Sequence, residues 1–241
     1  MKNSWLLLPL LSTLVFTSCD NDISGPRIHG TGPTVAEVRT LNSFKRVELS
    51  IDAEVVLTQG SPQQVRVEAQ RNVLDVLETE IDGSELQIEF GHVNVRRHDP
   101  IKVYITVPEL TEVQLSGTGK IRSDAPLTTS NCKVEVSGTG VADLNFAQVT
   151  ELQTTLTGSG EIRLSGSGQS HKCSSSGSGQ VSAYDFKTQD TNVSITGSGQ
   201  SYVQASHHLN VEITGSGNVF YKGSPMVNTR ITGSGRVQAD N

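Results

Sequence analysis

The chain has 241 residues, enough for one or two domains, and carries a net charge of −6. This acidity argues against nucleic acid as the main partner, because phosphate backbones are bound by basic surfaces. The 23 glycines are too few for collagen, and the recurring alternation of Val, Ile and Leu argues against wholesale disorder. Residues 19–116 hold 9 Lys and Arg against 16 Asp and Glu, whereas residues 117–241 hold 9 of each. Two regions of different surface chemistry are therefore expected.

The N-terminus has the pattern of a bacterial lipoprotein signal peptide. Lys2 precedes an apolar run from Trp5 to Phe16, which is shorter than the ~20 residues that span a bilayer. Two small residues and Cys19 follow, as in a lipobox, where cleavage precedes a cysteine that becomes lipid-modified. We therefore predict a signal peptide over residues 1–18, lipidation of Cys19, and an outer-membrane anchor facing the periplasm or the cell surface. An ordinary secretory signal with an incidental cysteine is the alternative.

Residues 19–34 are expected to form a tether, and residues 35–115 an N-terminal β region. The latter alternates between apolar and polar residues, with turn residues at 59–62 and 82–84. One helical turn is expected at 72–77. This region is predicted to cap a repeat domain, since an uncapped solenoid end exposes core and strand edges. The expected strands are residues 44–51, 54–58, 65–69, 86–90 and 101–107.

A Gly-Ser/Thr-Gly tripeptide recurs every 18 to 21 residues through the second half of the chain. About 20 residues at ~3.3 Å each give a circumference of roughly 65 Å, which suits one turn of a β-helix. Glycine permits the positive φ of a sharp corner. We predict an all-β protein in which residues 116–241 form a single-stranded, right-handed parallel β-helix. The tripeptides begin at Gly117, Gly138, Gly158, Gly177, Gly197, Gly215 and Gly233.

The coil between Gly158 and Gly177 departs from the pattern. It contains an extra tripeptide starting at Gly166, and its inward positions carry His171, Cys173 and Ser175 where neighbouring coils carry apolar residues. We expect a weakly packed or locally looped coil here. A metal site is the alternative, but ligands at zinc spacing are missing, so no metal is predicted.

Cys132 and Cys173 lie two coils apart in the predicted β-helix. Two steps of ~4.8 Å separate them by about 9–10 Å along the axis, beyond the ~7 Å limit between the Cα atoms of a disulfide. Both cysteines are therefore predicted to be reduced residues of the core.

Hydroxyl residues stand immediately before each tripeptide and between its two glycines, and by alternation both sets should point outward. One interpretation is structural, with the hydroxyls bonding to neighbouring backbone. A second is a flat, uncharged face for a glycan or another surface, and a third is ice binding, although the inner column is mostly Ser. The candidate binding face comprises Thr139, Thr157, Ser159, Ser176, Ser178, Thr196, Ser198, Thr214 and Ser216.

The sequence resembles the GIN-domain family, described as heads of autotransporter adhesins and common in Bacteroidota. The resemblance covers roughly Arg39 to Val237 and includes the repeated coils. It implies a β-helix and an envelope location, and it brings no established functional residues. The other segments that carry it are Arg39–Val47, Val56–Gly60, Ile101–Pro108 and Leu115–Gly119.

Asp143, Glu161 and Asp185 are carboxylates on consecutive coils, but they stand five, three and eight residues after their glycines. They do not align as a glycosidase pair, so no catalytic residue and no cofactor is predicted. We predict a non-catalytic envelope lipoprotein that acts as an adhesin or a glycan- or protein-binding scaffold. Its expected partners are the membrane, through the lipid, and a surface glycan or envelope protein. The alternatives are a structural or signalling-associated envelope protein without a ligand and a polysaccharide-active enzyme.

Overall fold

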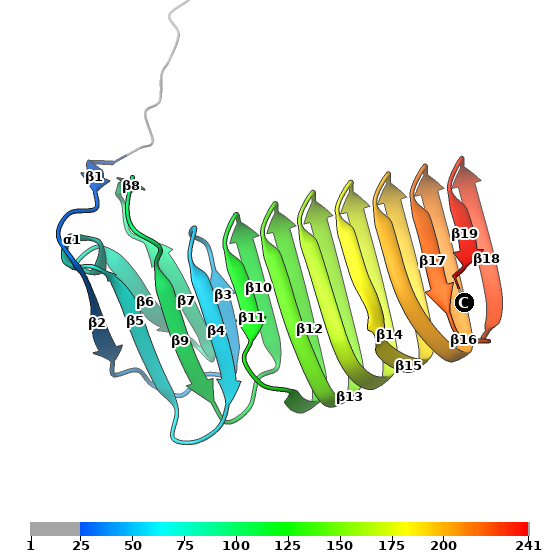
Figure 1. Cartoon of the computed structure of the whole chain (residues 1–241), viewed down its shortest axis with the longest axis horizontal. Coiled ribbons are helices and arrows are strands. Elements are labelled where there is room, and N and C mark those ends of the chain that lie inside the picture. The colour runs from blue at the N-terminus through cyan, green and yellow to red at the C-terminus, as the bar shows by residue number, and fades with distance from the viewer. Residues whose placement is uncertain (1–24, 241) are drawn as a thin grey trace, which may run out of the picture.

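The structure is a computed structural model that describes residues 25–240. This part of the chain is almost entirely β, and it forms one long stack of strands with the helical turn α1 (Arg71–Leu74) near the N-terminal end (Figure 1). The predicted signal peptide and Cys19 lie outside the described residues. Over residues 25–240 no helix is both long and apolar enough to cross a membrane.

The repeat region is a parallel β-solenoid, as predicted from the glycine spacing. Successive strands pair in parallel, and the first glycine of each tripeptide lies opposite the first glycine of the next, from Gly117 to Gly233. Because β13 to β16 contain 16 to 18 residues each, a coil is nearly one continuous strand. The strands that end at these glycines are β10 (Glu112–Gly117), β12 (Leu127–Gly138), β13 (Val141–Gly158), β14 (Glu161–Gly177), β15 (Gln180–Gly197), β16 (Gln200–Gly215) and β18 (Met226–Gly233).

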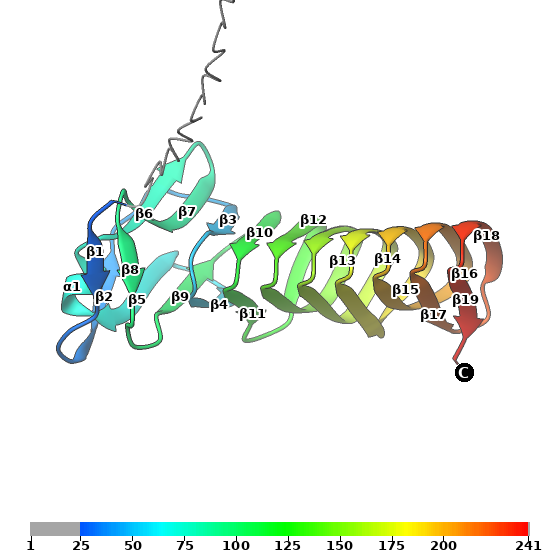
Figure 2. The ribbon, with the colours of Figure 1, turned by 90° about the horizontal axis from the view of Figure 1, so that it is seen from above.

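Shorter strands complete the coils at both ends. β11 (Lys120–Ser123) pairs with β13, β17 (Asn218–Lys222) with β16, and β19 (Arg236–Ala239) with β17, all in parallel. Differences in coil length are absorbed on the side away from the glycine corner, where the register shifts between Phe146 and Val149 and again between Ala183 and Lys187. The glycine corner itself therefore stays in register along the whole stack (Figure 2).

The stack extends N-terminal to residue 116. β3 (Arg46–Leu49) and β4 (Glu54–Gln59) pair in parallel with β10 and β11, and β7 (Glu85–Phe90) and β9 (Lys102–Val107) pair in parallel with β3 and β4. The corner between β3 and β4 reads Ser-Ile-Asp-Ala over residues 50–53. Because this corner lacks the glycines, the tripeptide pattern did not reveal these coils.

Antiparallel strands close the N-terminal end. β5 (Gln64–Gln70) lies between β2 (Thr34–Arg39) and β9, and β6 (Leu77–Asp82) forms a hairpin with β7. β1 (Arg27–His29) and β8 (Asn94–Arg96) form a separate parallel pair. Residues 27–29, which we expected in the tether, are thus part of a sheet.

The core is built from columns of equivalent side chains. In the column Leu115, Val136, Leu156, Ser175, Ile195 and Ile213, every residue is buried between its neighbours in adjacent coils. Since coils repeat every ~4.8 Å, each inward side chain is covered above and below, and the buried apolar area drives the stacking. Cys132 and Cys173 are buried in this core, and both are free.

The last coil of the solenoid is stacked on one side only, so it shows how much stability a side chain gains from being covered on both sides. Ile213 and Ile231 occupy the same column, but Ile213 is 0% exposed and Ile231 is 42% exposed, because no described coil covers β18. We expect Ile213→Ala to lower the free energy of unfolding by about 3 kcal/mol, and Ile231→Ala by about 1 kcal/mol or less. Urea unfolding of both variants measures the difference. Equal losses would show that the last coil is covered in solution.

The coil containing Gly166 is well packed, contrary to the expected weak packing or loop. Phe146, Gly166 and Phe186 stand in one register on three successive coils, and β14 continues unbroken through the extra tripeptide. The two phenylalanine rings meet across the coil between them, with centroids 6.1 Å apart, and Gly168 leaves room for this contact because a Cβ there would lie 2.8 Å from the Phe186 ring. Phe186 also packs edge-on against His171 at 5.7 Å. The extra glycines thus make room for a core aromatic cluster.

Candidate functional site

The predicted hydroxyl residues form one continuous ridge along the glycine corner of the solenoid. One column lies immediately before the first glycines, and the second lies between the two glycines of each tripeptide; we call these two columns the hydroxyl ridge. All nine residues of the predicted face belong to it, and all nine are exposed. The ridge follows the edge of the molecule where the strands of the repeat region end in arrowheads (Figure 1). Its members are Ser116, Ser137, Thr157, Ser176, Thr196, Thr214, Thr232, Thr118, Thr139, Ser159, Ser178, Ser198, Ser216 and Ser234.

The two glycines of each tripeptide shape the ridge for different reasons. The first glycines have φ between 101° and 124°, which turns the chain at the corner. The second glycines, apart from the one in the last coil, are buried, and a Cβ atom there would overlap the preceding coil: at Gly179 it would lie 2.7 Å from the carbonyl oxygen of Gly160. The residue between the two glycines points outward from the corner, and its hydroxyl is exposed to solvent.

Backbone hydrogen bonds hold this corner rigid from coil to coil. The amide of each middle residue donates to the first glycine of the preceding coil, for example Ser178 N to Gly158 O at 2.9 Å and Ser198 N to Gly177 O at 2.8 Å. The same pattern recurs from Thr139 to Ser234. The ridge therefore repeats at the ~4.8 Å spacing of the strands.

The hydroxyl groups of the ridge are free to bind water or a ligand. Among residues 25–240, no side-chain hydrogen bond involves any hydroxyl of the ridge. The structural interpretation, in which these hydroxyls bond to neighbouring backbone, is therefore not what the structure shows. The corner amides already have carbonyl partners, so the hydroxyls are not needed there. Each can donate one hydrogen bond and accept two.

A shallow groove lies beside the ridge and was not predicted from the sequence. It has a volume of about 350 Å³ and runs across the outer face of β14, β15, β16 and β18. Asn192, Asn210 and Asn228 stand in register along it, and Asn210 Nδ2 donates to Asn192 Oδ1 at 2.9 Å. Their spacing of 18 residues equals the length of these coils, which is the sequence signal that points to them.

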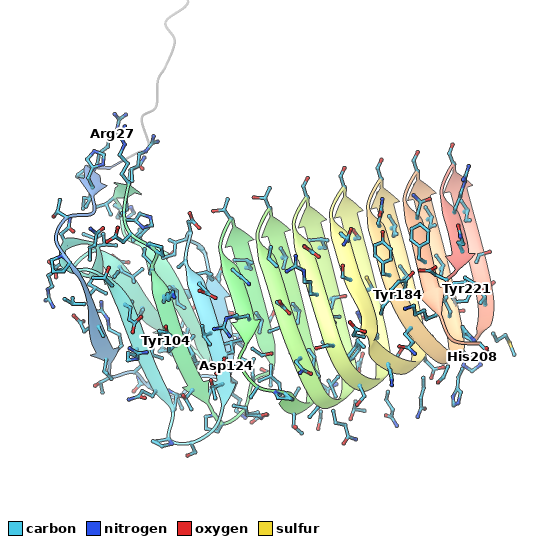
Figure 3. All side chains as sticks on the ribbon, in the orientation of Figure 1. Arg27, Tyr104, Asp124, Tyr184, His208 and Tyr221 are labelled. Carbon is cyan, nitrogen blue, oxygen red and sulfur yellow. The ribbon has the colours of Figure 1, made fainter. Side chains whose placement is uncertain are left out.

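An aromatic row on the opposite face was also missed. Tyr184, Tyr202 and Phe220 recur every 18 residues, with ring centroids 5.2 and 5.1 Å apart (Figure 3 labels Tyr184). The rings of Tyr202 and Phe220 are stacked, and Lys222 Nζ lies 4.5 Å from the centroid of the Tyr184 ring. Because the rings cover one another, this row joins neighbouring coils instead of presenting open ring faces to a ligand.

The carboxylates considered for catalysis are not paired with one another. Arg163 lies between the first two, 2.6 Å from Glu161 and 4.0 Å from Asp143, and Asp185 stands opposite Ser165. In the described part of the chain, no three His, Cys, Asp or Glu side chains gather as a metal site would require. The arrangement therefore offers no acid–base pair of the glycosidase type.

The inward polar residues belong to the core. His171 Nε2 is 2.9 Å from Thr154 Oγ1, and burial lowers the pKa of His171 to about 4. Burial likewise raises the pKa of the Cys173 thiol. The imidazole is thus neutral and the thiol protonated near neutral pH, and both side chains are covered by the coils above and below. They form a buried polar cluster and not an accessible site.

The fold and the ridge define a solenoid whose distinctive chemistry is on its surface, in a regular array of uncharged groups. The chain belongs to the family described as "Putative auto-transporter adhesin, head GIN domain", whose model matches residues 43–225. No curated protein is significantly similar to this chain in sequence.

Solved structures share the fold. A "putative adhesin" from Bacteroides fragilis is 21% identical, with a TM-score of 0.83, over 88% of this chain and 100% of that one. A "Putative lipid binding protein" from Parabacteroides distasonis is 24% identical, with a TM-score of 0.76, over 89% and 100%. A "putative adhesin" from Parabacteroides merdae is 21% identical, with a TM-score of 0.69, over 90% and 100%. At these identities the likeness concerns the fold alone.

Proposed function

We propose that this protein is a non-catalytic adhesin of the cell envelope that binds a surface glycan along the hydroxyl ridge. The observation that carries the proposal is the row of exposed hydroxyls without protein partners, held at regular spacing by the hydrogen-bonded glycine corner. The family description as an adhesin head agrees with it. The lipobox-like Cys19 supports a lipid anchor on the outer membrane.

The chemistry of the ridge fits an extended, uncharged and hydroxyl-rich polymer. Sugar hydroxyls and serine or threonine hydroxyls are both donors and acceptors, so they bond to each other directly or through water without a charge on either side. A single such contact is weak, but a polymer that lies along several coils makes many contacts at once. The asparagines of the adjacent groove add amide donors and acceptors beside the ridge.

The test changes three hydroxyls in the middle of the ridge. Thr196→Glu, Ser178→Glu and Ser198→Glu place bulky charges on two adjacent coils. We expect this triple variant to bind the wild-type glycan ligand about a hundredfold more weakly, because each lost hydrogen bond contributes about 1 kcal/mol. A glycan array with the purified protein identifies the ligand, and titration of that ligand gives the ratio of dissociation constants.

A matched control carries the same charges on the opposite corner of the solenoid. Thr150→Glu, Gln169→Glu and Gln189→Glu are exposed and lie away from the ridge. This control is expected to bind like the wild type. The proposal fails if no glycan binds the wild type above background, or if both triple variants lose binding equally. Capture of an envelope protein that depends on the ridge would instead support a protein-binding scaffold.

A further inference from the structure

The small parallel sheet of β1 and β8 presents a polar face to solvent. Arg27 lies opposite Asn94, Ile28 opposite Val95, and His29 opposite Arg96. Because side chains alternate along a strand, Arg27, His29 and Arg96 share one face, and the apolar pair shares the other. Val95 packs against the hydrophobic core, so the face with the arginines points outward. This sheet stands at the far end of the molecule from the last coil (Figure 1).

Three arginines lie on this sheet or directly beside it without a carboxylate partner, and Arg96 Nε donates a hydrogen bond to Asn94 Oδ1 at 3.0 Å. Arg27, Arg96 and Arg97 are exposed, and within residues 25–240 no carboxylate lies within 4.0 Å of any of them. Arg97 directly follows β8 with a φ of 53°, a left-handed backbone conformation that is uncommon outside glycine. Arg27 is labelled at this end of the molecule in Figure 3. We call Arg27, His29, Arg96 and Arg97 the basic tip.

The basic tip differs from the rest of the protein in its charge. The chain as a whole carries −6, and most of the other arginines are neutralised by a carboxylate within 4.0 Å. Asp99 is the acidic residue nearest to the tip in sequence, and its Oδ2 accepts a hydrogen bond from Thr34 Oγ1 at 3.5 Å. The paired arginines are Arg39, Arg46, Arg66, Arg71, Arg122, Arg163 and Arg230.

We propose that the basic tip binds the phosphate groups of an anionic lipid surface. The guanidinium group matches phosphate with two parallel hydrogen bonds. Arginines without a carboxylate partner keep such donors available, and in Arg96 only Nε is occupied, by Asn94 Oδ1. Anionic lipids attract arginines near the membrane surface, and three on one tip act together. The net acidity of the remaining surface opposes general binding to polyanions, so contact is confined to this end.

The position of the tip in the chain favours a membrane over a soluble anion. β1 begins at Arg27, eight residues after Cys19. At about 3.4 Å per residue, this segment spans at most roughly 27 Å. A lipid on Cys19 would therefore hold the tip close to headgroups at high effective concentration. This last step rests on the lipid anchor proposed above, whereas the charge of the tip does not.

The experiment compares binding to two kinds of vesicle. The full chain carrying Cys19→Ser is mixed with vesicles of phosphatidylcholine alone or of phosphatidylcholine with phosphatidylglycerol, and the partition coefficients are measured by sedimentation. The partition coefficient for the vesicles with phosphatidylglycerol is divided by the coefficient for phosphatidylcholine alone. This ratio cancels the contribution of the N-terminal residues, which are identical in every variant. We expect Arg27→Gln, Arg96→Gln and Arg97→Gln together to lower this ratio about a hundredfold, and added salt to lower it in the unsubstituted protein.

A matched control removes three cations from the solenoid. Lys172→Gln, Lys187→Gln and Arg236→Gln change the net charge equally, and we expect the ratio to stay near that of the unsubstituted protein. Circular dichroism checks that both triple variants are folded. Equal binding to both vesicle types, or equal loss in both variants, would overturn the proposal. The proposal would also be overturned if inorganic phosphate competed for the protein as strongly as phosphatidylglycerol vesicles do, because this would indicate a site for a free anion.

A second measurement uses the lipidated protein. Hydrogen exchange of the β1 and β8 amides should slow when phosphatidylglycerol is included in the vesicles, and the exchange of β18 should not change. Unchanged exchange at β1 and β8 would contradict the proposal. The expected change in hydrogen exchange does not depend on glycan binding by the ridge. Either proposal can therefore fail without the other.

Discussion

Replacing Gly177 by alanine is expected to lower the free energy of unfolding by about 4 kcal/mol or more, among the largest effects of a single substitution. Gly177 has a φ of 117°, and a Cβ there would lie 2.4 Å from the carbonyl oxygen of Gly158. That oxygen accepts backbone hydrogen bonds from the next coil, so it cannot move away without breaking them. Urea unfolding, with circular dichroism as the signal, measures the loss.

Gly83 is the control for backbone strain without overlap. It has a φ of 60° in the hairpin between β6 and β7, and no atom lies within 4 Å of a Cβ built there. Gly83→Ala is expected to cost only about 1 kcal/mol, the price of the left-handed conformation alone. Similar losses of stability in both variants would show that the close approach of the coils is not the reason why this corner requires glycine.

Phe186→Ala is expected to lower the free energy of unfolding by about 3–5 kcal/mol. The ring is fully buried and contacts Phe146 and His171, and it reaches to 2.8 Å from where a Cβ of Gly168 would lie. Glycine has no side chain that can move into the vacated space, so a cavity would remain in the core. Thermal and urea unfolding both report the loss.

Phe220→Ala gives the matched comparison. Phe220 stacks on Tyr202 in the aromatic row, but it is partly exposed. We expect this variant to lose about 1 kcal/mol, because less apolar area is buried and water fills the space. A similar loss of stability in both variants would argue that Phe186 does not fill a space left by the extra glycines.

The repeat and the ridge could be predicted because they depend on local chain geometry. A fixed spacing of corner glycines determines the coil length, and alternation then decides which residues point outward. The same reasoning misjudged the coil around Gly166. Alone, His171, Cys173 and Ser175 indicate poor packing, but the core at that point also receives Phe146 and Phe186 from the adjacent coils. Packing between coils depends on register, which a single coil does not reveal.

The remaining surface features depend on pairing between distant segments. Tyr184, Tyr202 and Phe220 become neighbours only when successive coils are stacked, and Arg27 shares a face with Arg96 only because β1 pairs with β8. The coils of β3 with β4 and of β7 with β9 carry no glycine signal and were recognised only by their parallel register.

By itself, the sequence determined that this chain winds into a β-solenoid and that two columns of hydroxyls point outward, because a corner that needs glycine repeats at a fixed interval. The tertiary structure decided where the stack begins, how the atypical coil is filled, and which arginines stand together without carboxylate partners. These properties are set by contacts between residues tens of positions apart, and such contacts exist only once the register of the strands is fixed.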